Sequence, residues 1–232
     1  MVRNVAQITE LLQSDMRQSF LTFMADSVNP VYRESRLADE AARRYRPFRG
    51  ETVKSVIQAT RNLLEIVAIL GGQWPHSSYM VPGGIASLPS ARDLLLCKQT
   101  AAFFRDWYEE RILGCSLERW REVTSLAALE EWLAESPAHR ESELGFFTRF
   151  CREMDLTGVG AWPASFVSYG MLPLPEGSGV RGRKPGTGLL VPAGFARGGE
   201  VEPFAQEQVR EDTSCSWYED GEGPLHPREG RT

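Results

Sequence analysis

The chain has 232 residues, of which 42% are hydrophobic and 25% charged, and this composition is typical of a soluble globular protein with one large domain or two small ones. Its net charge of −5 excludes a broad basic surface for nucleic acid, and we expect the basic residues of segment 181–184 to lie in a solvated, glycine-rich loop. No apolar run approaches the roughly 18 residues of a membrane span, and the first residues lack the apolar core of a signal peptide. We therefore expect no transmembrane segment and no export signal of the chain's own.

The chain has four cysteines, and no two of them form a Cys-x-x-Cys pair. The chain is also too long to be a small disulfide scaffold. We expect free thiols in a reducing compartment, with Cys97 and Cys151 as small core residues on helices. The other two are Cys115 and Cys215.

The first two-thirds of the chain predicts helices. Apolar residues recur at helical spacing over 4–24, and Asn29-Pro30 should end this helix soon after Asp26. A strongly apolar helix is predicted over 51–70, where Gly71-Gly72 offers the left-handed conformation that commonly ends a helix.

A glycine- and proline-rich loop, GGQWPHSSYMVPGG, covers residues 71–84 and separates this helix from the next. Ser90 is the expected N-cap of a helix that ends at Gly114. Further helices are predicted near 117–124, near 126–135, and from Ser136-Pro137 through Met154.

The amino-acid composition changes at Gly158, after which the chain is rich in glycine and proline. The short apolar segments 165–172 and 188–195 predict strands of a small sheet, joined by a loop over 175–187. The predicted fold class is therefore mainly α with a small β region (α+β).

Two regions are expected, a helical bundle over 1–157 and a β-rich and irregular region over 158–232. The first residues already follow a helical pattern, and the last ones complete no helix or strand. We therefore expect both ends to be cut rather than finished, with the second region continuing beyond the chain end.

Spacing alone predicts no complete active site. The three histidines His76, His139 and His226 are far apart, and the sequence contains no His-x-x-x-His pair, no phosphate-binding loop and no Gly-x-Ser-x-Gly turn.

Three features have two interpretations each. Asp26 is either an exposed carboxylate at a helix end or a buried one near a reactive centre. His76 is either a core histidine with satisfied ring nitrogens or a residue that orients or tunes a nearby cofactor. The pairs Trp217-Tyr218 and His226-Pro227 either pack an irregular tail or line a cofactor wall.

Two segments resemble the large subunit of nickel–iron hydrogenases, most closely its uptake and sensory branch. The first is Gly71-Gly72, Trp74-Pro75-His76 and Val81-Pro82-Gly83-Gly84, which is similar to a Gly-Gly-Lys-x-Pro-His…Gly-Gly motif. The second is similar to a Ser-Trp-Tyr followed by His-Pro-x-x-Gly-x-Thr, and its residues are Glu211, Ser216, Trp217, Tyr218, His226, Pro227, Gly230 and Thr232.

The resemblance implies roles for particular residues. Asp26 would correspond to a carboxylate in the canopy over the metals and is the candidate catalytic residue. His76 would lie close to the small subunit's nearest iron–sulfur cluster and would serve electron transfer through hydrogen bonding and local polarity. Pro75, Gly83 and Gly84 would shape the backbone around that ring, and the tail motif would be structural.

The family binds nickel and iron, the latter with CN and CO ligands, through two Cys-x-x-Cys motifs, and neither motif occurs in this chain. We therefore expect a central fragment of a large subunit that holds no metal and is inactive alone. A split subunit completed by other chains is a second interpretation. A metal-free scaffold, as in the quinone-reducing subunits of respiratory complex I, is a third.

The resemblance implies reversible oxidation of H2 to protons and electrons, with an iron–sulfur small subunit as partner. The chain's own sequence predicts a cytoplasmic or peripherally membrane-associated location. Some family members are exported through a signal on the small subunit, so export with that partner is also compatible with the resemblance.

Overall fold

The computed structural model describes residues 1–173, 188–212, 224–226 and 228–229. The chain divides into two compact units, Met1–Val159 and Gly160–Thr232, and each is described by itself. The first unit is helical and the second contains a small antiparallel sheet, which confirms the predicted α+β class.

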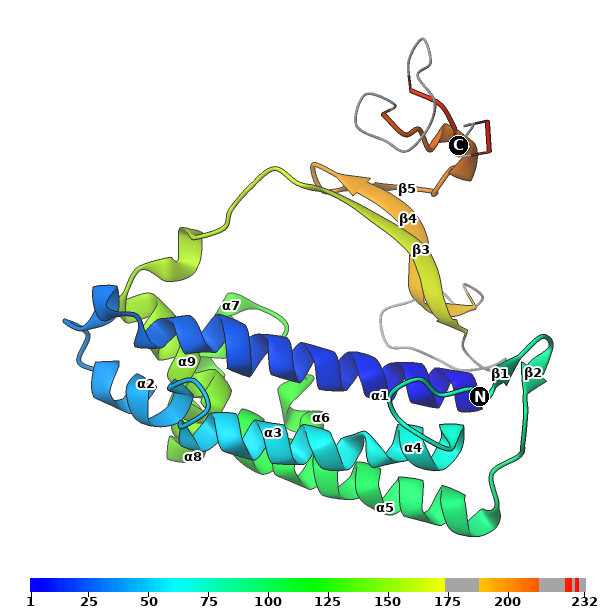
Figure 1. Cartoon of the computed structure of the whole chain (residues 1–232). Helices are drawn as coiled ribbons and strands as arrows, with labels where there is room; N and C mark the ends of the chain where they lie inside the picture. Colours follow the sequence, from blue (N-terminus) through cyan, green and yellow to red (C-terminus); the bar gives the residue numbers. More distant parts are fainter. Residues whose placement is uncertain (174–187, 213–223, 227, 230–232) are drawn as a thin grey trace. The chain divides into compact units, whose positions relative to one another are not determined.

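The first unit has long helices at its centre and shorter ones at one end. Its helices are α1 (Val2–Arg17), α2 (Ala38–Tyr45), α3 (Glu51–Leu63), α4 (Glu65–Gly71), α5 (Ala91–Trp107), α6 (Leu117–Trp120), α7 (Leu126–Glu135), α8 (Pro137–Glu141) and α9 (Glu143–Glu153). Helix α1 lies along α3 and α4, and α5 packs against the same two helices (Figure 1). None of the helices in the described part of the chain has the length and apolar character needed to cross a bilayer.

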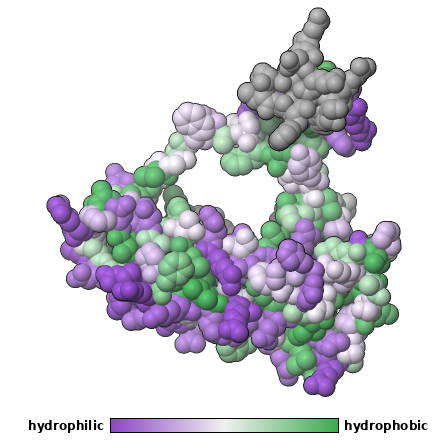
Figure 2. All heavy atoms as spheres, in the orientation of Figure 1, coloured by the Kyte–Doolittle hydropathy of each residue, from purple (hydrophilic) through white to green (hydrophobic). Residues whose placement is uncertain are grey.

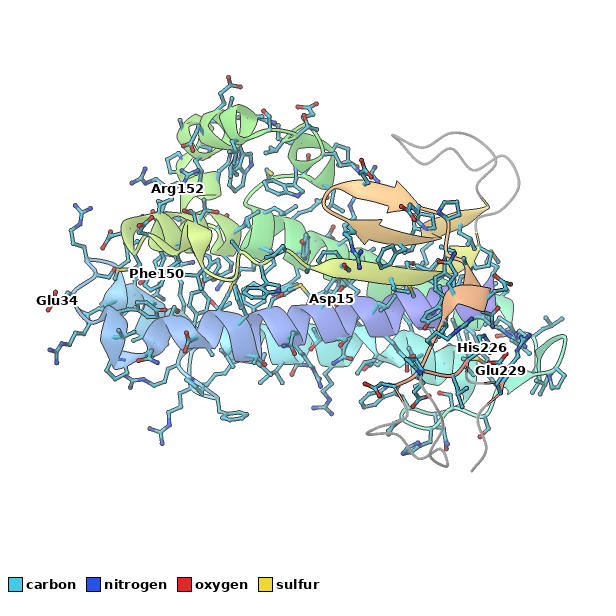
Figure 3. All side chains as sticks on the ribbon, turned by 90° about the horizontal axis from the view of Figure 1, so that it is seen from above. Asp15, Glu34, Phe150, Arg152, His226 and Glu229 are labelled. Atoms are coloured by element: carbon cyan, nitrogen blue, oxygen red, sulfur yellow. The ribbon has the colours of Figure 1, made fainter. Side chains whose placement is uncertain are left out.

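The core of this unit is rich in aromatic side chains. Tyr45, Phe146 and Phe150 are fully buried, and the rings of Tyr45 and Phe146 lie 5.8 Å apart. Phe150 lies inside the unit and meets Tyr32 edge to face, whereas Arg152 on the same helix reaches the surface (Figure 3). Such pairs contribute beyond the area that they bury.

Several predicted helix boundaries are confirmed. Ser90 and Asp93 form a capping box at the start of α5, and the Ser136 hydroxyl accepts from the Ala138 amide at the start of α8. Gly72 and Gly114 both have left-handed φ values, +80° and +68°, and each ends a helical segment.

Several predicted helices are interrupted. The helix predicted from Ser136 through Met154 breaks at Ser142 into α8 and α9, and the helix predicted to end at Gly114 continues after α5 as a π-helical segment, Tyr108–Leu113. The helix predicted over 4–24 stops being α-helical at Arg17 and continues as a π-helical segment, Gln18–Phe23, and a 3₁₀ segment, Met24–Val28. The extra residue in a π turn shifts the register, and Phe20 and Met24 are both buried. The helix predicted over 51–70 breaks at Leu64, whose carbonyl accepts from the Val67 amide and tightens the chain between α3 and α4.

The second unit has a sheet of three antiparallel strands in the order β3-β4-β5. The strands are β3 (Ser165–Pro173), β4 (Leu189–Arg197) and β5 (Glu200–Glu202), so the two predicted strands are confirmed and the third is additional. Gly198 and Gly199 both have positive φ and connect β4 to β5. A two-residue turn with positive φ at both positions matches the twist of a hairpin.

Candidate functional site

The candidate site is the segment from Gly71 to Ala86, here called the 71–86 loop, which includes the motif predicted from sequence. It begins where α4 ends. A side chain at Gly71 would lie 2.9 Å from the Ser77 hydroxyl and 3.0 Å from the Tyr79 ring, so only glycine lets the returning loop pack on the end of α4.

His76 lies on the surface of this loop. Its backbone is left-handed, with φ of +65°, and its carbonyl accepts from the Gln73 side chain at 2.6 Å. The Ser77 hydroxyl donates back to the Gln73 carbonyl, and the preceding Trp74–Pro75 peptide is cis. His76 is exposed and Trp74 is 42% exposed.

The interpretation of His76 as a core histidine is therefore wrong. The reason is that the chain has left α4 through Gly72, and the bonds between Gln73, His76 and Ser77 close a small turn within the loop itself. The imidazole stays in contact with water instead of entering the bundle. It can therefore meet a partner surface without any unfolding of the loop.

The second half of the loop is a β-hairpin, which the sequence pattern did not predict. Strand β1 (Met80–Val81) pairs with β2 (Gly84–Ile85), and Gly83 has φ of +82° in the turn between them. Pro82 and Gly83 are the residue types that a type II turn favours at its two central positions. The hairpin is extended by a 2.8 Å hydrogen bond from the Ala86 amide to the Tyr79 carbonyl.

Arg3 on α1 reaches this hairpin. Its guanidinium donates to the carbonyl oxygens of Val81 and Gly84, the pair that closes the turn. Sequence reasoning missed this residue, because 78 positions separate it from Val81 and no local pattern connects them.

Tyr79 secures the loop from the other side. Its side chain is only 5% exposed, and its hydroxyl has no hydrogen-bond partner among the described residues. Burial raises the pKa of this hydroxyl, the Glu10 carboxylate raises it further, and Arg3 acts in the opposite direction. Tyr79 is thus a neutral, buried side chain whose ring packs against Gly71 at the start of the loop.

Asp26 does not lie in the 71–86 loop. It is exposed on the 3₁₀ segment Met24–Val28, and its carbonyl accepts from the Asn29 amide at 2.8 Å. The flanking Met24 and Ser27 are buried instead. Of the two interpretations, the structure of this chain shows the exposed helix-end carboxylate.

The tail motif is described only in part. Glu211 pairs with Leu225 in an isolated antiparallel bridge, and His226 Nδ1 accepts from the Arg228 amide while Nε2 lies 3.3 Å from the Gln206 carbonyl. His226 and Glu229 lie in one turn, closed by a 2.8 Å backbone bond between them (Figure 3). The remaining predicted residues, Ser216, Trp217, Tyr218, Pro227 and Gly230, lie outside the described residues.

A buried ionic cluster joins α2, α3 and α9, and sequence reasoning missed it. The Glu143 carboxylate, 3% exposed, accepts from the Tyr45 hydroxyl at 2.8 Å and from the Thr52 hydroxyl at 2.7 Å. The Arg44 guanidinium lies 3.2 Å from the same carboxylate. A buried carboxylate is normally paired in this way, but no spacing motif in the sequence connects these four residues.

Burial and nearby charges set the ionisation of Tyr45 in this cluster and of Glu40 beside it. Hydrogen bonds from Arg43, and less strongly from Arg44, lower the pKa of Glu40 to about 2 against the opposing effect of burial. Burial and the adjacent Glu143 raise the pKa of the Tyr45 hydroxyl. Glu40 is therefore ionised and Tyr45 neutral at physiological pH.

His139, and not His76, is the buried histidine of the first unit. Its ring stacks on Trp132 with centroids 5.0 Å apart and planes 7° apart, and Nδ1 lies 2.8 Å from the Trp132 carbonyl. The only sequence signal was its place just after the N-cap Ser136, where α8 turns the ring toward α7. The role is structural.

The described residues do not fit a thiolate-bound metal centre. Within the described ranges, no group of three or more His, Cys, Asp or Glu side chains is placed to hold a metal ion. Burial raises the pKa of Cys97, Cys115 and Cys151, which opposes formation of the thiolate that a soft metal binds. The described residues of this chain therefore supply no ligand set for such a centre.

Comparisons with known proteins identify relatives. A family model described as nickel-dependent hydrogenase matches residues 55–232. The as-isolated oxidized Ni-Fe-Se hydrogenase from D. vulgaris Hildenborough is similar in fold, with a TM-score of 0.67 and 19% identity over 100% of this chain and 41% of that chain. A reduced, active Ni-Fe-Se hydrogenase from Desulfomicrobium baculatum gives a TM-score of 0.68 and 17% identity over 100% and 43%. The chain thus spans less than half of the length of these hydrogenases.

Proposed function

The chain belongs to the nickel-dependent hydrogenase family, and we propose that it is the middle part of the large, catalytic subunit of such an enzyme. The proposed reaction is oxidation of H2 to protons and electrons, and the electrons pass to an iron–sulfur small subunit. The family match carries this proposal, because it extends over residues 55–232 and so includes the whole 71–86 loop and the tail motif.

The exposed surface of the 71–86 loop supports a role on the side of the small subunit. His76 and the large apolar side chains Trp74 and Met80 are presented to solvent, the latter two at 42% and 57% exposure. An imidazole held on a fixed turn can donate a hydrogen bond to a group beside a partner's iron–sulfur cluster. It can also change the local polarity around that cluster. In this proposal Pro75, Gly83 and Gly84 set the backbone that carries the ring.

Asp26 is proposed as the carboxylate above the metals. Its support is the resemblance of the segment that it ends to the corresponding segment of the family, since Asp26 lies outside the matched residues 55–232 and is exposed in this chain. In the intact enzyme the nickel–iron centre, with CN and CO ligands on iron, supplies activation of H2. Residues outside this chain's described part would hold that centre, and the chain alone would be inactive.

We propose that the protein is located in the cytoplasm or at the surface of a membrane. If the enzyme is exported, the signal on the small subunit would carry both subunits across the membrane.

Removal of the chain in its source cells tests the proposed function. The coding segment is deleted in frame, and H2-dependent reduction of a viologen dye is measured in anaerobic extracts before and after complementation. We expect the H2-dependent rate to be lost and then restored by the complementing copy. In cells that contain no other candidate hydrogenase, absence of any H2-dependent rate before the deletion would contradict the proposal and favour a metal-free scaffold. A rate that the deletion leaves unchanged would contradict the proposal as well.

A further inference from the structure

Arg3 connects two segments that are far apart in the sequence. It lies in the first turn of α1, and the start of this helix is near the β1–β2 hairpin (Figure 1). One terminal nitrogen of its guanidinium donates to both the Val81 and the Gly84 carbonyl. A backbone carbonyl has two lone pairs, so each oxygen can accept from Arg3 in addition to a strand hydrogen bond.

Among the described residues, none packs closely around the two glycines at the tip of the hairpin. An added Cβ at Gly83 or Gly84 would have no described heavy atom within 4 Å beyond its chain neighbours. Met80 and Val81 are exposed, at 57% and 37%. Apolar and hydrophilic side chains are mixed over the face of the molecule that Figure 2 shows. An isolated two-stranded hairpin is marginal in water, so a charge-assisted hydrogen bond at its closing pair changes its stability measurably.

The hairpin and the His76 turn form one continuous unit. Tyr79 precedes β1, bonds through its carbonyl to the Ala86 amide, and packs its buried ring against Gly71. His76 is only three positions before Tyr79, and its own turn is closed by Gln73 and Ser77. Only Ser77 and Ser78 separate His76 from Tyr79, so a change in the position of the hairpin can be passed to the segment that carries the imidazole.

We propose that Arg3 is a positioning residue of the 71–86 loop, which fixes the hairpin to α1 and through it the orientation of His76. The structural part of this inference is independent of the enzyme's activity. Only the consequence for electron transfer rests on the proposed function.

Amide hydrogen exchange of the full 232-residue chain tests the structural part. The reporter is the Ala86 amide, which donates to the Tyr79 carbonyl at 2.8 Å. We expect Arg3→Gln to accelerate its exchange about tenfold, as loss of roughly 1.4 kcal/mol of local stability implies. Exchange of core amides such as that of the buried Val56 should stay unchanged.

Two further variants make the result specific. Arg3→Lys keeps the charge and several donors and should restore part of the protection of Ala86. Arg121→Gln removes one positive charge from an exposed residue at the end of α6. The exchange rate of the Ala86 amide in this variant should equal that of the unmodified chain. Equal Ala86 exchange in Arg3→Gln and Arg121→Gln would overturn the inference.

The consequence for electron transfer needs the assembled enzyme. We expect Arg3→Gln to lower H2-dependent dye reduction several-fold while H2–D2O isotope exchange, which needs no electron acceptor, keeps its rate. Equal loss of both rates would contradict a role on the electron-transfer side. If the unmodified assembly shows neither activity, the proposed function fails, and accelerated Ala86 exchange would still support the positioning role of Arg3.

Discussion

The hydroxyl of Tyr45 on α2 donates a 2.8 Å hydrogen bond to the carboxylate of Glu143 at the start of α9, 98 positions away in the sequence. Both side chains are buried, and Arg44 and Thr52 complete the coordination of the carboxylate. The contact connects the segment that follows Asp26 to the last long helix of the first unit.

Replacement of Glu143 by glutamine should therefore destabilise the fold strongly. Tyr45 and Thr52 bond to different carboxylate oxygens, so the new amide would keep an oxygen for only one of them. It would also remove the buried negative charge that lies 3.2 Å from the Arg44 guanidinium. We expect the free energy of unfolding in urea to fall by about 3 kcal/mol. The matched control is Glu130→Gln, whose carboxylate is 60% exposed and paired with Arg152, and its expected cost is below about 1 kcal/mol. Similar costs for the two variants would show that the cluster is not stabilising.

Acid should weaken the fold partly through Glu40. Its pKa is about 2 in the folded chain against an ordinary value of 4.5, because Arg43 and Arg44 bond to its carboxylate. A depressed folded pKa contributes stability that is complete above pH 4.5 and is lost as pH falls toward 2. The difference in urea midpoint between the unmodified chain and Glu40→Gln should therefore shrink over this interval. Glu131→Gln, at an exposed position, serves as control. If the difference in urea midpoint between Glu40→Gln and the unmodified chain did not depend on pH, the low pKa assigned to Glu40 would be refuted.

Gly145 should not accept a side chain. A Cβ there would lie 2.0 Å from the His139 carbonyl oxygen and 2.9 Å from that of Arg140, both backbone atoms. Gly→Ala in a helix ordinarily stabilises by up to about 1 kcal/mol, but the clash with backbone should reverse the sign and cost about 2 kcal/mol or more. Gly158→Ala is the control, because no described atom lies within 4 Å of its Cβ position, and its expected effect on thermal unfolding is small. A stabilised Gly145→Ala chain would contradict the close approach of α8 to α9.

The purified chain should not bind nickel stoichiometrically. Burial raises the pKa of each of the three described thiols, and the described residues include no cluster of three potential ligands. Equilibrium dialysis against nickel is the measurement, with a variant that has serine at Cys97, Cys115, Cys151 and Cys215 as control. We expect the same weak binding in both proteins. One nickel per chain, lost in the serine variant, would show that the cysteines form a metal site.

Local chemistry accounts for what the sequence predicted well. Ser90, Ser136, Gly72 and Gly114 bound helices because capping hydroxyls and left-handed glycines act on neighbouring residues only. The strand segments 165–172 and 188–195 were found for the same reason, since an apolar run between turn residues is a local signal.

Contacts between distant residues account for what the sequence did not predict. The bonds of Arg3 to the hairpin and of Tyr45 to Glu143 join positions 78 to 98 apart, and no spacing pattern marks them. The exposure of His76 depends on a turn closed by Gln73 and Ser77, whereas its apolar neighbours alone favoured a core position. The family resemblance located the loop, and the structure showed how the loop is held.

Isolation of the chain from its source cells tests the central claim most directly. The chain is tagged at its chromosomal position and purified without oxygen, and the metal content and protein composition of the purified material are measured together. The account predicts that the chain is recovered in an assembly that contains nickel, iron and an iron–sulfur subunit and that reduces a dye with H2. Recovery of the chain without nickel and without an iron–sulfur partner, from cells with active hydrogenase, would contradict it.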